Sequence, residues 1–125
     1  MICDTDVLVW ATRGTLRAAR AIDSAADRAL SIVSFMELIQ GARSKIEARQ
    51  IRQSLHRLQF RILPLSESIG ASAADIIEQH ALAQGIQVAD ALIAATAIET
   101  DLPLCTANAK HFRPIGGLSR VEFRP

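Results

Sequence analysis

Short apolar segments alternate along this chain with longer segments of helical pattern, and this alternation constrains the fold more than any other feature. The apolar segments are residues 1–3, ALSIVS at 29–34, FRILPL at 60–65, LPLCT at 102–106 and SRVEF at 119–123. Helical composition or an apolar helix face marks residues 15–28, 35–43, 44–59, 66–84 and 88–99. Such an alternation predicts an α/β fold, in which a parallel sheet is covered by helices on both faces.

The composition indicates one domain spanning residues 1–125. Half of the 125 residues are apolar and only 4% are aromatic, so we expect a core of aliphatic side chains. The sequence shows neither the pattern of a signal peptide nor a run of about 18 apolar residues, so we expect no membrane span. Cys3 and Cys105 each lie in an apolar run, which favours buried thiols of a cytoplasmic protein over a disulfide or a metal pair.

Two carboxylates interrupt the first apolar stretch, MICDTDVLVW. Asp4 directly follows the first predicted strand, and Thr5 and Asp6 come next. In open parallel sheets, binding sites collect beyond the carboxyl ends of the strands, where the strand order reverses. The sequence therefore predicts that Asp4 belongs to a site at this edge of the sheet.

Two further acids are candidates for the same site. Glu37 lies in FMELIQGAR, just after the predicted strand that ends at Ser34, and Asp90 lies near the start of the Ala-rich helix at 88–99. Each acid also has an interpretation that needs no metal. Ser34 and Glu37 form a capping-box pattern, and a negative charge at Asp90 would stabilise the N-terminus of its helix. Three converging carboxylates repel one another in a low-dielectric cleft, and a hard cation such as Mg²⁺ or Mn²⁺ removes that repulsion. This chemistry suggests metal-assisted hydrolysis of a phosphodiester.

Three segments together carry a family pattern. They are DTDVLVW, SIVSFMELIQGAR and the long VADALIAATAIETDLPLCTANAKHF, and their order and spacing hold over nearly the whole chain. This pattern resembles the motifs of PIN-domain ribonucleases, and within that group the VapC-type toxins of toxin–antitoxin modules. The resemblance implies a three-layer α/β/α sandwich on a parallel sheet of four to five strands. It also implies Mg²⁺- or Mn²⁺-dependent endonuclease action on RNA, a homodimer, and a small VapB-like antitoxin that blocks the active groove.

The resemblance also assigns roles to individual residues. Family positions carry over to Asp4, Glu37 and Asp90 as catalytic and metal-binding residues. The supporting residues are Thr5, Asp6, Thr106 and Asn108. Many relatives have Asn at the position of Asp6, so Asp6 is expected to be an additional carboxylate rather than a direct metal ligand.

One departure from the family pattern concerns the metal. Relatives usually carry a fourth acid near the end of the third segment, where this chain has Asn108 and His111. The amide oxygen of Asn108 remains a possible ligand, whereas an imidazole suits Mg²⁺ poorly. The missing charge predicts weak metal binding, above all at a second metal position.

The charges of the chain are unevenly distributed. Its net charge is +1, yet residues 13–61 carry ten basic and four acidic side chains. This basic segment is suited to holding RNA beside the carboxylates, with Arg43, Arg49 and Arg52 as candidate substrate-binding residues, although solvated helix faces would have the same composition. The apolar stripes within residues 35–58 are an alternative docking surface for an antitoxin.

Two other functions fit parts of the sequence. Haloacid-dehalogenase-type phosphatases also open with an Asp-x-Asp between apolar runs, where Asp4 would be the nucleophile, Asp6 the acid and base, and Ser34 part of a second motif. Their chemistry needs a later acidic pair, and none follows Lys110. A catalytically weak or degenerate PIN-like module that binds RNA or a partner is the other alternative, because the fourth acid is missing.

Overall fold

Five parallel strands form the centre of the molecule in the computed structural model, which describes residues 1–125. The strands are β1 (Ile2–Cys3), β2 (Ala29–Ser31), β3 (Arg61–Leu63), β4 (Leu104–Thr106) and β5 (Arg120–Glu122). Their order across the sheet is β3-β2-β1-β4-β5, and every neighbouring pair is parallel. The parallel sheet that the sequence predicts is confirmed.

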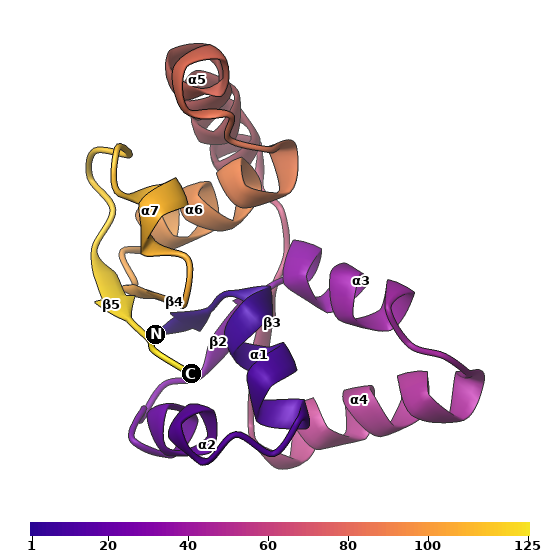
Figure 1. Cartoon of the computed structure of the whole chain (residues 1–125). Coiled ribbons are helices and arrows are strands. Elements are labelled where there is room, and N and C mark those ends of the chain that lie inside the picture. Colours follow the sequence, from indigo (N-terminus) through magenta and orange to yellow (C-terminus); the bar gives the residue numbers. More distant parts are fainter.

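Seven helices cover both faces of this sheet. They are α1 (Thr5–Thr12), α2 (Leu16–Asp23), α3 (Ile32–Gln40), α4 (Lys45–Arg57), α5 (Glu67–Gln84), α6 (Val88–Thr100) and α7 (Ala109–Phe112). Helices α5, α6 and α7 lie on one side, while α1, α2 and α4 lie on the other, and the α3–α4 hairpin projects outward (Figure 1). This is the expected three-layer α/β/α sandwich. No helix combines the length and the hydropathy that a bilayer-spanning segment requires.

Two apolar cores lie on opposite faces of the sheet, because successive residues of a strand point to opposite sides. Ile2 belongs to the core under α5 and α6, and Cys3 belongs to the core under α1 and α2. The Ala-rich face of α6 is almost fully buried, so this helix packs closely on the sheet. Cys3 and Cys105 are register partners on β1 and β4; both are buried free thiols, and burial raises their pKa to about 12 and about 11, so they stay neutral.

Helix boundaries follow local capping chemistry. The hydroxyls of Ser44 and Ser66 accept hydrogen bonds from backbone N–H groups in the first turns of α4 and α5, and Gly85 ends α5 with a φ of 68°. The expectation for α3 is wrong. Ser31 rather than Ser34 caps this helix, since its hydroxyl accepts from the N–H of Val33, and β2 ends three residues earlier than predicted.

The strand order reverses between β1 and β4. The chain moves outward from β1 to β2 and β3, then returns to the other side of β1 to form β4 and β5. The N–H of Asp4 donates to the carbonyl of Cys105 over 2.9 Å, which fixes the end of β1 against the end of β4. The fold therefore places Asp4 at the topological switch point, where parallel α/β sheets bind their ligands.

Candidate active site

Asp4 is held rigidly between two strand ends. It is the N-cap of α1, and only 6% of its surface is exposed. One carboxylate oxygen, Oδ1, accepts from the N–H of Thr5 over 2.8 Å, and Oδ2 accepts from the hydroxyl of Thr106 over 2.9 Å. The Thr106 hydroxyl accepts in turn from the N–H of Asn108, so the turn after β4 is tied to the carboxylate after β1.

The environment of Asp4 disfavours its negative charge. Burial raises the pKa of Asp4 to about 7, and the neighbouring charges of Asp6 and, to a smaller extent, Asp90 add to the increase. The hydrogen bonds from Thr106 and Thr5 offset only part of it. Asp4, Asp6 and Asp90 thus lie close enough to influence one another electrostatically, whereas Glu37, the third acid of the predicted group, is not among the charges that raise the pKa of Asp4 or Asp6.

Asp6 has one carboxylate oxygen without a protein partner. It lies in the first turn of α1, and its Oδ2 accepts from the N–H of Ala107 over 3.1 Å. Its Oδ1 is buried and makes no hydrogen bond. Burial raises the pKa of Asp6, with the charge of Asp90 as a smaller contribution. A buried, unpaired carboxylate oxygen is costly unless a cation or a proton satisfies it.

Asp90 faces the short helix α7. It lies in the first turn of α6, and its Oδ2 is 3.5 Å from Nδ1 of His111. The same ring nitrogen is 2.9 Å from the side-chain amide of Asn108. The Asn108 amide can donate to Nδ1 only when this nitrogen carries no proton. When Nδ1 carries a proton, it can donate to the Asp90 carboxylate instead. The two residues at the fourth-acid position therefore place polar side chains, and no carboxylate, beside Asp90.

Glu37 reaches the site through Thr5. It lies in the middle of α3 and is exposed, and its Oε1 accepts from the Thr5 hydroxyl over 2.8 Å. The fully buried Ser34 hydroxyl lies 2.9 Å from the same Thr5 oxygen. Since a hydroxyl has one proton, Thr5 donates to the carboxylate and can accept from Ser34. The capping-box interpretation of Glu37 is wrong, because Ser34 lies inside the helix.

The carboxylates do not form a ready-made metal cage. No three His, Cys, Asp or Glu side chains are arranged around a single point in the way that a metal would require. The donors nevertheless suit Mg²⁺ or Mn²⁺, because they are hard oxygens and Asp6 Oδ1 is buried without a partner.

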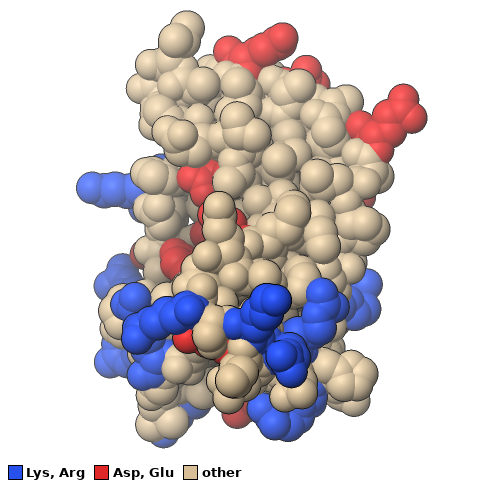
Figure 2. Space-filling model, turned by 90° about the vertical axis from the view of Figure 1, so that its right-hand side faces the viewer, with Lys and Arg blue, Asp and Glu red and all other residues tan.

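A polar cleft of about 540 Å³ opens from Thr5 and Glu37 between α1 and the α3–α4 hairpin, and we call it the arginine cleft. Arg13 and Arg43 line it, and only three of its twelve lining residues are apolar. Figure 2 shows Lys and Arg side chains gathered on the lower part of the molecule, over the half that contains α1 to α4. Arg43 thus lies on the cleft that reaches the site, as the sequence suggested.

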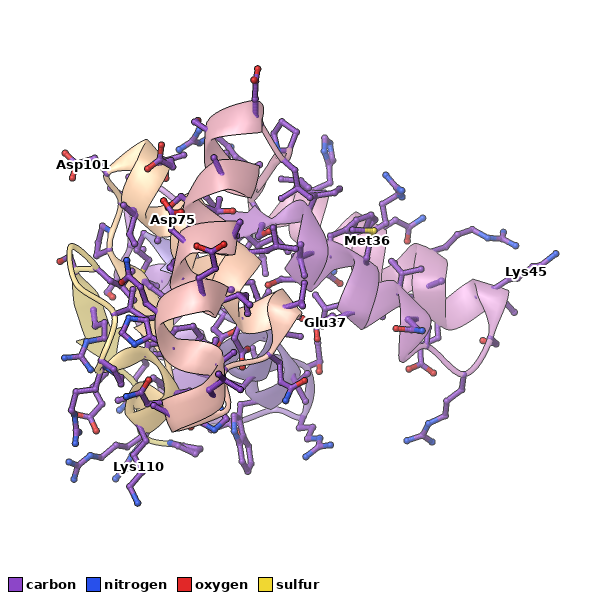
Figure 3. All side chains as sticks on the ribbon, turned by 90° about the horizontal axis from the view of Figure 1, so that it is seen from above. Met36, Glu37, Lys45, Asp75, Asp101 and Lys110 are labelled. Carbon is purple, nitrogen blue, oxygen red and sulfur yellow. The ribbon has the colours of Figure 1, made fainter.

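Arg49 and Arg52 lie elsewhere. They line a separate hollow of about 620 Å³ with Phe35, Met36 and Ile39, which we call the α4 hollow. The guanidinium carbon of Arg52 lies 4.8 Å from the centre of the Phe35 ring. Met36 and Glu37 leave α3 in different directions (Figure 3), so the hollow and the carboxylate site lie on different sides of this helix. The structure does not bring these two arginines to the acids.

Comparison with known proteins shows the family to which this fold belongs. The model of the PIN domain family matches residues 1–118. The chain belongs to the PIN domain family. This PIN domain is also 37% identical over 116 residues to Ribonuclease VapC10 of Mycobacterium tuberculosis, a match that spans 90% of this chain and 85% of that protein.

Solved structures share the fold of this PIN domain. A toxin–antitoxin complex from Klebsiella pneumoniae superposes with a TM-score of 0.80 at 27% identity, covering 94% of this chain and 93% of that one. FitAcB from Neisseria gonorrhoeae gives 0.75 at 26% identity, covering 97% and 96%. VapBC2 from Rickettsia felis, bound to a DNA fragment from its promoter, gives 0.82 at 23% identity over 98% of both chains, and this supports the fold alone.

The family assignment sets the phosphatase interpretation aside. Ser34, which that interpretation places at a strand end, lies buried within the α3 helix of this PIN domain. Sequence reasoning also missed two features of the site. The hydrogen-bonded series from Ser34 through Thr5 to Glu37 depends on the packing of α1 against α3, and Arg13 carries no motif. Its link to the site comes from α1, a helix that the sequence analysis did not predict.

Proposed function

We propose that this PIN domain is a divalent-metal-dependent endoribonuclease, the toxin of a type II toxin–antitoxin pair. The observation that supports this most is the group of acids at the switch point, where the buried Asp4 and the half-buried Asp6 lie near Asp90 and the buried Oδ1 of Asp6 has no partner. The mutual repulsion of such a group is unfavourable, and a bound cation would remove it. Its relative in Mycobacterium tuberculosis bears the name ribonuclease.

In this proposal Asp4, Glu37 and Asp90 hold Mg²⁺ or Mn²⁺, and Asp6 contributes a further carboxylate. The ion, when bound, supplies charge neutralisation at the phosphate and lowers the pKa of a water molecule. Thr106 and the N–H of Thr5 orient Asp4 through its two oxygens, and the hydroxyl of Thr5 orients Glu37 through one. Asn108 and His111 add no charge, which favours one ion over two.

The same proposal includes partners. The similar structures from Klebsiella pneumoniae and Neisseria gonorrhoeae support a VapB-like antitoxin as the partner of this chain, since the first is described as a toxin–antitoxin complex. We assign the α4 hollow to that partner, because its lining is largely apolar and its exposed Met36 is 52% accessible. A homodimer is the expected state of the toxin.

Cleavage of RNA by the purified chain, free of any partner, tests this function. A structured RNA is incubated with the protein in Mg²⁺, in Mn²⁺ and in EDTA. Cleavage is expected only with metal, and Asp4→Asn and Asp90→Asn should each abolish it. Asp75→Asn is the matched control, because Asp75 is an exposed acid on α5, away from the strand ends (Figure 3).

The alternative function makes a different prediction in the same assay. A degenerate module would bind the RNA and leave it intact under every metal condition, and Asp4→Asn would then bind as well as the unchanged chain. Cleavage that persists in EDTA or in both Asn variants would contradict the metal site and point to a contaminating nuclease.

A further inference from the structure

The arginine cleft meets the carboxylate site at Thr5 and Glu37. Thr5 and Glu37 line the cleft, and the same two residues share the hydrogen bond that ties α3 to the site. The cleft is lined mainly by polar residues, including Gln50 and Ser54 of α4. Its charged lining residues are Arg13 and Arg43 and the acids Glu37 and Glu47, so a phosphate chain in this cleft would be held by the two arginines.

The two arginines of this cleft have free guanidinium groups. Neither Arg13 nor Arg43 makes an ion pair or a side-chain hydrogen bond, whereas Arg61 and Arg124 are ion-paired and Arg28 is bonded to backbone carbonyls. Both are exposed. Unpaired guanidinium groups present several N–H donors in one plane, which matches the geometry of a phosphate.

Arg13 is also partly oriented. It is the C-cap of α1, and its guanidinium carbon lies 5.8 Å from the centre of the Trp10 ring. Stacking on an aromatic face leaves the in-plane N–H donors available. Because Asp4 is the N-cap of α1 and Arg13 is its C-cap, Arg13 lies roughly 13 Å along the helix from Asp4.

The structure separates these arginines from the others on the basic surface. Arg49 and Arg52 border the α4 hollow, and Arg52 is stacked on Phe35. Arg17 is exposed on α2 and borders neither the cleft nor the hollow. Only Arg13 and Arg43 combine a free guanidinium with a place on the cleft that reaches Glu37.

We propose that the arginine cleft is the path of the RNA strand, and that Arg13 and Arg43 hold backbone phosphates on one side of the cleaved bond. This inference rests on the ribonuclease function proposed above, and it names the part of the surface on which that function acts. The two arginines position the strand and take no part in breaking the bond. The contacts are to phosphates, so they carry no sequence preference.

The test measures binding and cleavage separately. Binding of a fluorescently labelled RNA oligonucleotide is followed by anisotropy in EDTA, and KM and kcat are measured in Mn²⁺. Arg13→Ala and Arg43→Ala should each weaken binding and raise KM by about 10-fold, with kcat within about two-fold. Each should also lower the slope of log Kd against log salt by about 0.7. Arg13→Lys and Arg43→Lys should restore part of the affinity and all of the salt slope. Arg17→Ala is the control and should match the unchanged chain.

Three results would overturn the inference. If RNA affinity and its salt dependence were unchanged in Arg13→Ala and Arg43→Ala, the cleft would be excluded as the path of the RNA strand. Equal or larger losses in Arg49→Ala and Arg52→Ala would place the strand over the α4 hollow. Loss of binding to a co-purified protein partner, with RNA binding intact, would assign the cleft to that partner. If the expected binding pattern holds but no metal supports cleavage, the RNA path stands and the proposed nuclease activity fails.

Discussion

The hydroxyl of Thr106 donates to Oδ2 of Asp4 over 2.9 Å and joins the ends of two neighbouring strands whose residues are 102 positions apart. This contact is buried, and it connects the two elements between which the strand order reverses. It also lowers the pKa of Asp4, against the larger effect of burial. The stability of the sheet edge and the ionisation of the central acid therefore depend on the same hydroxyl.

Thr106→Val should impair the site while keeping the shape of the strand. The variant removes the donor, so the pKa of Asp4 should rise further above about 7. We expect metal binding or cleavage to fall roughly 10–100-fold, as for other groups that orient a metal ligand. Thr106→Ser, which keeps the hydroxyl, should retain most activity. Equal activity of the Val and Ser variants would show that the hydrogen bond does not matter.

The metal-free protein should lose stability as the pH rises from about 4 to about 7. The folded protein binds more protons than the unfolded chain in this range, because the pKa of Asp4 is about 7 when folded and 3.8 when free. The contribution of Asp4 to the free energy of unfolding is therefore greatest below about pH 4, decreases through this window and is lost above it. The total decrease is on the order of a few kcal/mol. The raised pKa of Asp6 adds to the same trend.

Urea unfolding in EDTA at several pH values measures this trend. Asp4→Asn should flatten the profile and should be more stable than the unchanged chain at pH 8, since it removes a buried charge. Parallel profiles for the two proteins would mean that Asp4 is not the group responsible.

Thr5→Val should release Glu37 from its fixed position. The variant removes the donor to Glu37 and leaves the buried hydroxyl of Ser34 without its partner. Cleavage should fall about 10-fold through kcat, and the free energy of unfolding should fall by about 1–3 kcal/mol. Thr5→Ser should restore both quantities. A stability loss with unchanged kcat would limit Thr5 to a structural role.

His111→Asp should strengthen metal binding. An acid at this position would add a negative charge beside Asp90, from whose Oδ2 the ring nitrogen of His111 is now 3.5 Å away. We expect Mg²⁺ affinity to rise by about 10-fold, measured by calorimetry with His111→Asn as the neutral control. Unchanged affinity would show that α7 does not contribute to the metal site.

Much of this architecture could be predicted from residue patterns. Apolar runs and helical composition are local patterns, and they predicted the five strands and every helix but α1 and the short α7. The start of α3 was missed because Ile32 and Val33 are β-branched and favour a strand, while the hydroxyl of Ser31 provides the cap that begins the helix.

The geometry of the site was less accessible to sequence reasoning. Acids at the ends of separate strands can be identified one by one, and the family pattern singled out Asp4, Glu37 and Asp90. Which oxygen is satisfied and which is not depends on packing, so the unpaired Oδ1 of Asp6 carries no sequence signal. Likewise, a count of charges in the sequence does not distinguish one basic residue from another. In the structure, Arg49 and Arg52 lie on the face of α4 that lines the α4 hollow, away from the acids.

Binding of Mn²⁺ to the purified chain tests the central claim most directly, because it does not depend on any RNA. Free Mn²⁺ is measured by electron paramagnetic resonance during a titration at pH 7.5. The account predicts one bound ion per chain, lost in Asp4→Asn and in Asp90→Asn and retained in Asp75→Asn. No bound ion at millimolar Mn²⁺, or equal binding in all four proteins, would contradict it.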